Sequence, residues 1–128
     1  MLTPNSTSQN KKIVALLTDL FFTVKINDAA KRAGVAIEFV KSERDALEKA
    51  AAQTVLVIID LNCAGVDALE IVRRLKAGDR TKGVGVVGYL SHVQGELKKQ
   101  AQESGCDMVL PRSAFSQNLP QILKRYAG

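Results

Sequence analysis

Residues 54–62 read TVLVIIDLN, and this stretch decides the fold. Five apolar residues, Val55 to Ile59, run without a break into Asp60. A continuous apolar run of this length is typical of a strand buried on both faces, as in parallel sheets that are covered by helices. Asp60 then lies at the carboxyl end of that strand, where open α/β sheets place their ligands. The stretch itself leaves two interpretations of Asp60 open, a cap for the following loop and a functional site.

The composition predicts one globular domain. A length of 128 residues suffices for one domain with a core and is too short for two ordinary domains. With 46% hydrophobic and 24% charged residues, the chain is globular rather than disordered. Residues 1–10 are rich in Ser, Thr and Asn, so we expect them to form a flexible tail. Residues 11–128 are expected to form the domain.

The same totals exclude several classes of protein. The net charge of +5 is spread along the chain and only 5% of residues are aromatic, so nucleic-acid binding is not expected. Cys63 and Cys106 lack the spacing of metal ligands and indicate reduced thiols, as in a cytoplasmic protein. No apolar run approaches the roughly 20 residues of a membrane span. Residues 1–10 also lack the apolar core of a secretion signal.

Strand and helix patterns alternate along the rest of the chain. Further strands are predicted at 13–17, 35–40, 84–90 and 108–110, and a helix follows each strand. Helix signals include Ser42 as an N-cap and three glycines as stops, namely Gly34, Gly78 and Gly105. Strict alternation predicts a doubly wound α/β fold: a five-stranded parallel sheet with five helices on its two faces. The order that we expect is 2-1-3-4-5.

Two local patterns carry less weight. Residues 83–88 read GVGVVG and fit the dinucleotide motif GxGxxG, but they lie inside a predicted strand rather than between a strand and a helix. Glycines in a strand more often indicate a bulge or close packing. His92 is the only histidine and has no Cys or His neighbour with which to bind a metal. Ser91 beside it is a candidate cap for the fourth helix.

Two acidic residues point to chemistry at the edge of the sheet. Asp19 ends the first predicted strand as Asp60 ends the third, and in the order 2-1-3-4-5 these strands are neighbours. Two adjacent carboxylates raise each other's pKa unless a cation neutralises them. Oxygen ligands suit Mg²⁺, and one carboxylate could then accept a phosphoryl group. The alternative is that both acids only cap loops.

At this point the sequence resembles the receiver domain of bacterial two-component response regulators, in a divergent or pseudo-receiver form. The resemblance covers roughly residues 11–126, and it is carried by the alternation of elements and by three stretches: VLVIIDLN, GVDALEIVRRL and ESGCDMVLPRS. It implies that Asp60 is the phosphoacceptor. It also implies that Asp19, Asp60 and the backbone carbonyl of Asn62 hold Mg²⁺.

The sequence departs from the family pattern at several positions. Thr18 stands where the family has the first acid of a pair, and Leu90 stands in place of the hydroxyl residue that ends the fourth strand. Ser91 is one place off, and Arg112 replaces the family's lysine, which leaves these two as degenerate contacts to the phosphoryl group. Val109 replaces the aromatic residue of the fifth strand that, in the family, helps to relay phosphorylation to the contact face. A phosphoryl group bound at the site would then make nearly the same contacts in two conformations of the domain, so it could shift the equilibrium between them only slightly.

These features support two main hypotheses. In the first, the chain is a phosphorelay receiver that takes a phosphoryl group on Asp60 from a histidine kinase, with Mg²⁺ as cofactor. In the second, it is a phosphorylation-independent pseudo-receiver that acts as a protein–protein interaction module. The interaction face would be formed by the fourth helix, fifth strand and fifth helix, and it could also pair two copies; its expected members are Leu90, Leu97, Val109, Arg112 and Tyr126.

A third hypothesis is a small flavodoxin-like or dinucleotide-binding enzyme that uses the same crevice. The first strand-to-helix turn, residues 18–22, lacks the glycines or the Ser/Thr-rich run that phosphate binding needs. We therefore expect a signalling protein with no catalytic residues beyond those named, rather than an enzyme.

Overall fold

The computed structural model describes residues 11–92 and 94–127. The predicted tail, residues 1–10, lies outside the described residues, as do Gly128 and Val93, which we expected at the start of the fourth helix. The strands are β1 (Lys12–Leu16), β2 (Ala36–Val40), β3 (Thr54–Asp60), β4 (Gly85–Leu90) and β5 (Met108–Pro111). The helices are α2 (Leu20–Ala33), α3 (Glu43–Ala50), α4 (Ala68–Ala77), α5 (Gly95–Ser104) and α6 (Arg112–Ala127).

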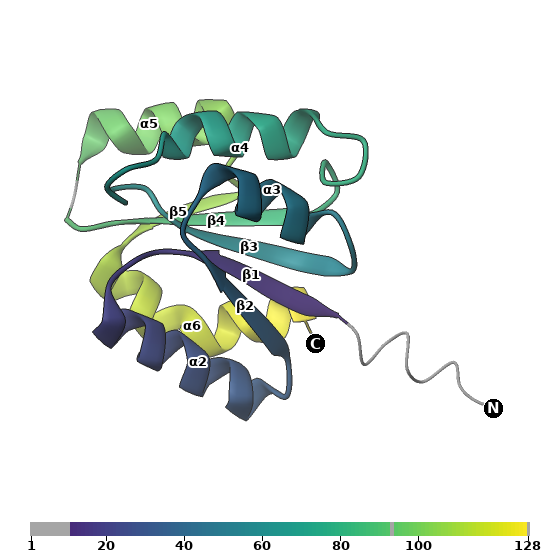
Figure 1. Ribbon diagram of the computed structural model, residues 1–128. Helices are drawn as coiled ribbons and strands as arrows, with labels where there is room; N and C mark the ends of the chain where they lie inside the picture. The colour runs from purple at the N-terminus through teal and green to yellow at the C-terminus, as the bar shows by residue number, and fades with distance from the viewer. Residues whose placement is uncertain (1–10, 93, 128) are drawn as a thin grey trace.

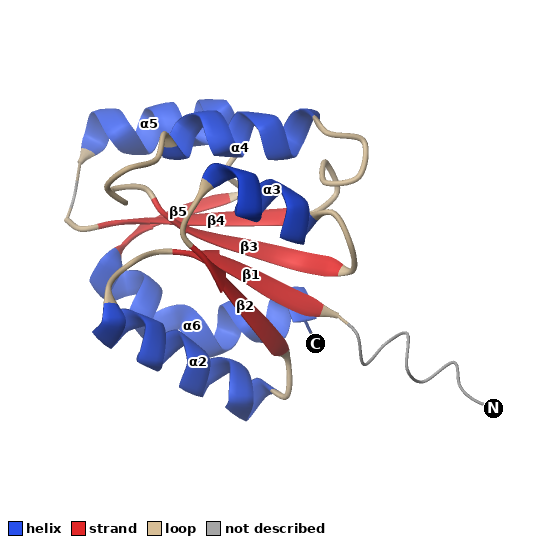
Figure 2. Cartoon of the chain, in the orientation of Figure 1, coloured by secondary structure: helices blue, strands red, loops and turns tan. Residues whose placement is uncertain are grey.

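The sheet has the predicted topology. Its five strands follow the order β2-β1-β3-β4-β5, and every neighbouring pair is parallel. Helices α3, α4 and α5 cover one face, whereas α2 and α6 cover the other (Figures 1 and 2). The doubly wound α/β prediction is therefore confirmed. No helix in the described part of the chain is long and apolar enough to cross a membrane.

Burial of the strands explains their composition. The central strands β1 and β3 are buried on both faces, which is why each reads as an unbroken apolar run. β2 lies at the sheet edge and is only partly buried, and Val35, Ile37 and Phe39 pack against the same core, as the alternation of residues 35–40 predicts. Register pairs Leu16 with Ile59, so the chain segments that follow β1 and β3 leave the sheet at the same edge.

The sheet separates two cores of different chemistry. Under α3, α4 and α5 the core is largely aliphatic, with members such as Ile71, Val72 and Leu75. Under α2 and α6 it includes a cluster of three rings, Phe22, Tyr89 and Phe115. The site described below lies at the edge of the sheet, between these two cores.

Most helix ends agree with the sequence signals, with one correction. Ser42 caps α3 by accepting the Asp45 N–H at 3.1 Å, and Gly34 ends α2 with a φ of 71° that favours glycine. Ser91 does not cap α5, because that helix begins at Gly95 after a bare N-cap at Gln94. α6 begins at Arg112, directly after β5, and continues through Pro120.

The GVGVVG pattern serves packing. Gly85 lies against the ring of Tyr126, and a Cβ atom at Gly88 would meet Leu61 Cδ1 at 2.8 Å. Both glycines sit inside β4 or at its start, with no helix opening after them. The close-packing interpretation is confirmed, since only a residue without a side chain fits at these two places.

Candidate functional site

The two predicted acids lie at the carboxyl edge of the sheet. Asp19 follows β1 and caps α2, with its Oδ1 accepting the Phe22 N–H at 3.1 Å. Asp60 is the last residue of β3, and its Oδ1 accepts the Asn62 N–H at 2.9 Å. The charge of Asp19 is close enough to contribute to raising the pKa of Asp60. The structure thus brings Asp19 and Asp60 together, and both also act as local caps.

Arg112, the first residue of α6, is bonded to Asp19, and its charge also acts on Asp60. Its Nη2 donates to Asp19 Oδ2, forming an ion pair, and its guanidinium stacks on the Phe22 ring with the Cζ atom 4.5 Å from the ring centroid. The pair is only partly shielded, because about a third of each side chain is exposed, 36% for Arg112 and 34% for Asp19. A cation at a helix N-terminus opposes the helix dipole, so the nearby carboxylates offset an unfavourable position.

The two carboxyls differ in their protonation. Burial raises the pKa of Asp60, and the Asn62 N–H and Arg112 only partly oppose that effect. The hydrogen bond from Arg112 lowers the pKa of Asp19, with further help from the Phe22 N–H. Asp19 is therefore the firmly ionised partner of Arg112, whereas Asp60 accepts a proton more readily.

The loop after β3 is tied to the end of β4. The side chain of Asn62 accepts the Ser91 N–H on its Oδ1 at 2.8 Å, and both residues are exposed. Ser91 thus takes part through its backbone, while its predicted contact to a phosphoryl group stays a prediction. This link positions the backbone around Asp60 without adding a charge.

The residues as arranged do not fit a Mg²⁺ site. Asp19 has both oxygens engaged and Asp60 has one, so Asp60 Oδ2 is the one carboxylate oxygen of the pair with no hydrogen bond to the described residues. Thr18 supplies no negative charge at the position where the resemblance implies an acid. Among the described residues, no group of three His, Cys, Asp or Glu side chains is placed to hold a metal. A cation, Arg112, is already present.

The residues expected at the switch and interaction face do not form one exposed surface. Leu90 and Val109 are buried in the aliphatic core, and Leu97 packs against it. Tyr126 lies over Gly85 at the start of β4 and belongs to the opposite core. The expectation of a shared contact face is corrected for Leu90 and Val109, because an apolar side chain at these positions is stabilised by burial.

Two features near the site were not predicted. Tyr89 is paired in register with Asp60, and its ring stacks on Phe115 with centroids 5.1 Å apart. The hydroxyl of Tyr89 is buried and has no hydrogen-bond partner among residues 11–92 and 94–127, and burial raises the pKa of the phenol well above its usual range. The second feature is an exposed apolar patch on α2, and the helical period that turns Phe22 and Ile26 inward was a signal for it; its members are Leu20, Phe21 and Val24.

Comparison with known proteins shows a likeness in structure. No protein-family model matches the sequence, and no curated protein matches it either. The chemotaxis response regulator CheY4 of Vibrio cholerae is 20% identical, with a TM-score of 0.78 over 91% of this chain and 98% of that one. A response regulator from Hahella chejuensis is 18% identical, with a TM-score of 0.79 over 91% of this chain and 95% of that one.

A third similar structure is the phosphorylated cyanobacterial phytochrome response regulator RcpA. It is 16% identical, with a TM-score of 0.75 over 91% of this chain and 94% of that one. Likeness at this level of identity concerns the course of the backbone, because fold and function vary separately. The chain has the fold of a response regulator receiver domain, and Asp19, Asp60 and Arg112 lie at the carboxyl edge of its sheet, where open α/β sheets place their ligands.

Proposed function

We propose that the chain is a receiver-like signalling module that binds a protein partner and does not depend on phosphorylation. The observation that carries this proposal is the patch formed by Leu20, Phe21 and Val24 on α2, with exposed fractions of 75%, 91% and 61%. These are the large hydrophobic residues left exposed in the described chain. An exposed apolar patch of this kind beside a site is typical of a protein contact.

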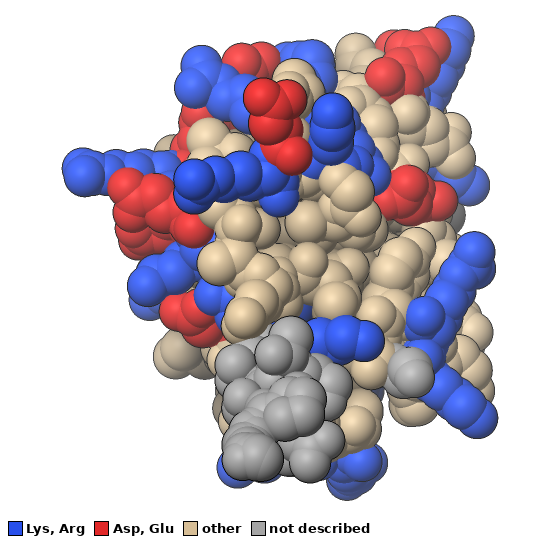
Figure 3. Space-filling model, turned by 90° about the vertical axis from the view of Figure 1, so that its right-hand side faces the viewer, with Lys and Arg blue, Asp and Glu red and all other residues tan. Residues whose placement is uncertain are grey.

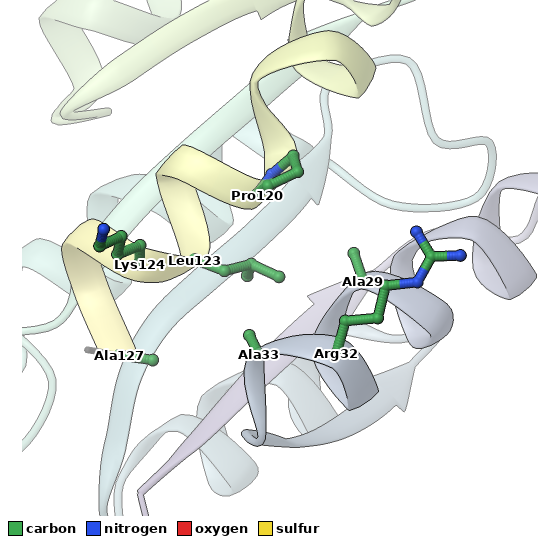
Figure 4. Close-up of a pocket in the computed structure, with 7 residues that line it drawn as sticks. All are labelled: Ala29, Arg32, Ala33, Pro120, Leu123, Lys124 and Ala127. Carbon is green, nitrogen blue, oxygen red and sulfur yellow. The ribbon is translucent and has the colours of Figure 1, made fainter.

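The patch continues into a groove between α2 and α6. Phe21 and Val24 line its first part, which has a volume of about 420 Å³ and also includes Lys25, Asp28 and Leu119. The adjoining part has a volume of about 310 Å³, and Figure 4 shows Ala29, Arg32 and Ala33 of α2 facing residues of α6 across it. Lysines and arginines outnumber acids along this groove, so a partner with apolar and acidic side chains fits it.

Lys and Arg side chains also gather on the surface beyond the groove. In Figure 3 the acidic side chains lie mainly in the upper part of the view, whereas the lower right carries Lys and Arg. Attraction between unlike charges speeds the encounter of two proteins more than it tightens their complex. The charges would therefore guide a partner, and the apolar patch would hold it.

The interior around the site supports a constant rather than a switched surface. Leu90 ends β4 with a buried aliphatic side chain, and Val109 on β5 is buried in the same core. Neither side chain has a polar group that could form a new hydrogen bond when charge is added at Asp60. A ligand shifts a conformational equilibrium only by its differential contacts with the two states.

A second candidate function is phosphoryl acceptance on Asp60 from a histidine kinase. Its support is specific: Asp60 Oδ2 has no partner among the described residues, the side chain is half-buried, and the guanidinium of Arg112 is close by. A carboxylate with a free oxygen beside a cation is suited to attack a phosphoryl group. The location of such a protein would be the cytoplasm, as the free cysteines suggest.

One pair of experiments separates the two candidates. A photo-crosslinker at position 21 in cells should capture a partner, and the purified partner should then lose about tenfold or more in affinity for a Phe21→Ser/Val24→Ser variant. Arg73→Ser, at an exposed position of α4, is the matched control and should bind normally. If binding is unaffected by the double change, the interaction proposal fails.

The second arm uses acetyl phosphate and intact-mass measurement. The proposal expects that treatment leaves the mass of the wild-type chain unchanged, and likewise the mass of Asp60→Asn. A gain of one phosphoryl group in the wild-type chain that is absent from Asp60→Asn would instead support the second candidate.

A further inference from the structure

Arg112 holds a place in the acid pair that a metal ion would need. Its guanidinium is bonded to Asp19 Oδ2, and its charge also acts on Asp60. With Asp19 Oδ1 capping α2, neither oxygen of Asp19 is left for another cation. We propose that Arg112 is the resident cation of this site and that it keeps divalent metal out. The proposal rests on the pocket alone and not on the proposed function.

The position of Arg112 is set by more than its charge. The guanidinium stacks on Phe22, and Phe22 is itself 6% exposed and packed against Tyr89 and Phe115, with centroids 5.0 Å and 5.8 Å away. A cation on an aromatic face gains from the ring's quadrupole. Release of Arg112 from Asp19 would therefore also disturb a contact with the buried ring cluster.

Position on the helix adds a second reason. Arg112 is the first residue of α6, where the helix dipole repels a positive charge. Two carboxylates at this edge of the sheet offset the repulsion, so Arg112 and the acids depend on one another. A lysine would keep the charge but would lose the planar fork and the stacking of a guanidinium.

Magnesium is a poor competitor for this arrangement. It requires near-octahedral oxygen ligands and gives up its waters reluctantly, and the pair offers it one free carboxylate oxygen, Asp60 Oδ2. Arg112 supplies one positive charge to the two acids without any such demand. The three groups together keep one negative charge and need no second cation.

It follows that removing the guanidinium should uncover a metal site. In Arg112→Ala and in Arg112→Gln, Asp19 Oδ2 becomes free beside Asp60, and we expect the affinity for Mg²⁺ to rise about tenfold or more. The measurement is an amide NMR titration with Mg²⁺ that follows Leu20 and Asn62, together with broadening of the same signals by Mn²⁺. The wild-type chain should show no saturable response at these residues. The glutamine variant covers the case in which the alanine variant does not fold.

Arg125→Ala is the matched control. Arg125 lies on the same helix and stacks over Tyr126, with its Cζ 5.8 Å from the ring centroid, but it is far along α6 from the acid pair. Its removal should leave the Mg²⁺ response as in the wild-type chain. Adding Asp19→Asn to Arg112→Gln should abolish the gained response.

Two results would overturn the proposal. One is saturable Mg²⁺ binding by the wild-type chain at Leu20 and Asn62. The other is a folded Arg112→Gln variant whose response equals that of the wild type. Neither result bears on whether the α2 patch binds a partner, so the two proposals fail separately.

Discussion

The two faces of the sheet are closed in different ways. On the face of α3, α4 and α5, helices enclose an aliphatic core, and an ion pair of Arg74 Nη1 with Glu43 Oε2 at 3.0 Å joins α4 to α3. On the face of α2 and α6, the core is aromatic near the site, and the helices leave a groove and an exposed apolar patch. The difference is the basis for our proposal that the side of α2 and α6 binds a partner.

Two alanines and a proline explain why the groove between α2 and α6 stays open. α2 turns Ala29 and Ala33 toward it, and these side chains fill little of the space opposite α6 (Figure 4). Pro120 has no N–H to donate to the carbonyl of Ser116, so the middle of α6 lacks one helical hydrogen bond at the groove. The other face has three helices and no such interruption.

The largest expected effect is at the aromatic core. Phe115→Ala should lower the free energy of unfolding by about 3–5 kcal/mol, because it removes a fully buried ring that supports Phe22 and Tyr89. It should also move the amide signals of Asp19 and Arg112. Denaturant unfolding followed by circular dichroism measures the first, and NMR the second.

Leu75→Ala on the other face is the comparison, with an expected loss of about 2–5 kcal/mol. It should leave the signals of Asp19 and Arg112 in place. Equal movement of those signals in both variants would mean that the two cores are not separate supports of the site.

A smaller effect is expected where β4 passes between the two cores. Gly88→Ala should cost about 1–3 kcal/mol, since the new Cβ would lie 2.8 Å from Leu61 Cδ1 in the aliphatic core. Gly83→Ala is the control, because a Cβ there has open space and should leave stability unchanged or slightly higher. Thermal unfolding of both variants checks this, and a neutral Gly88→Ala would show that the aliphatic core yields easily.

Tyr89→Phe should stabilise the protein. The change removes a buried hydroxyl that has no partner in the described part of the chain and keeps the ring, so the gain should be about 1 kcal/mol. Denaturant unfolding at neutral pH measures it. A loss of stability would show instead that the hydroxyl has a hydrogen-bond partner, such as a buried water, in the core under α2 and α6.

Asp60→Asn should change how stability depends on pH. Burial raises the pKa of Asp60 in the folded chain above its ordinary value of 3.8, so ionisation disfavours the folded state. The variant should therefore be more stable than the wild-type chain at pH 7. The difference should shrink as the pH falls through the folded pKa and vanish below the ordinary value. Unfolding measured from pH 7 down to about 3 checks this, and a constant difference would contradict it.

The smallest effect is expected at the surface ion pairs. Glu70 pairs with Arg73 at 3.1 Å and with Arg74 at 2.9 Å on α4, and all three side chains are at least a third exposed. Glu70→Gln should lower the stability only slightly, and less at high salt, because solvent and ions screen an exposed ion pair. Unfolding at low and high salt measures it. A larger or salt-independent loss would mean that ion pairs, and not apolar packing, close this face.

Much of the fold could be predicted from the sequence because buried parallel strands have a plain signature. The runs around Ile13–Leu17 and Val55–Ile59 located β1 and β3, and the acids that follow them were expected at one edge of the sheet, as the structure has them. The start of α6 could not be predicted, because Phe115 is the one buried residue in its first seven positions, which is too few to set a helical period. Local pattern is weak where a helix begins with few buried residues.

The sequence by itself determined the order of elements, the doubly wound sheet and the meeting of Asp19 with Asp60. These follow from the period of apolar residues and from the rule that parallel strands end at one edge. Only the tertiary structure decided that Arg112 pairs with Asp19, that Leu90 and Val109 are buried, and that the α2 patch stays open. The physical reason is that each of these depends on which side chains from distant segments occupy the same space, and no periodicity along the chain records that.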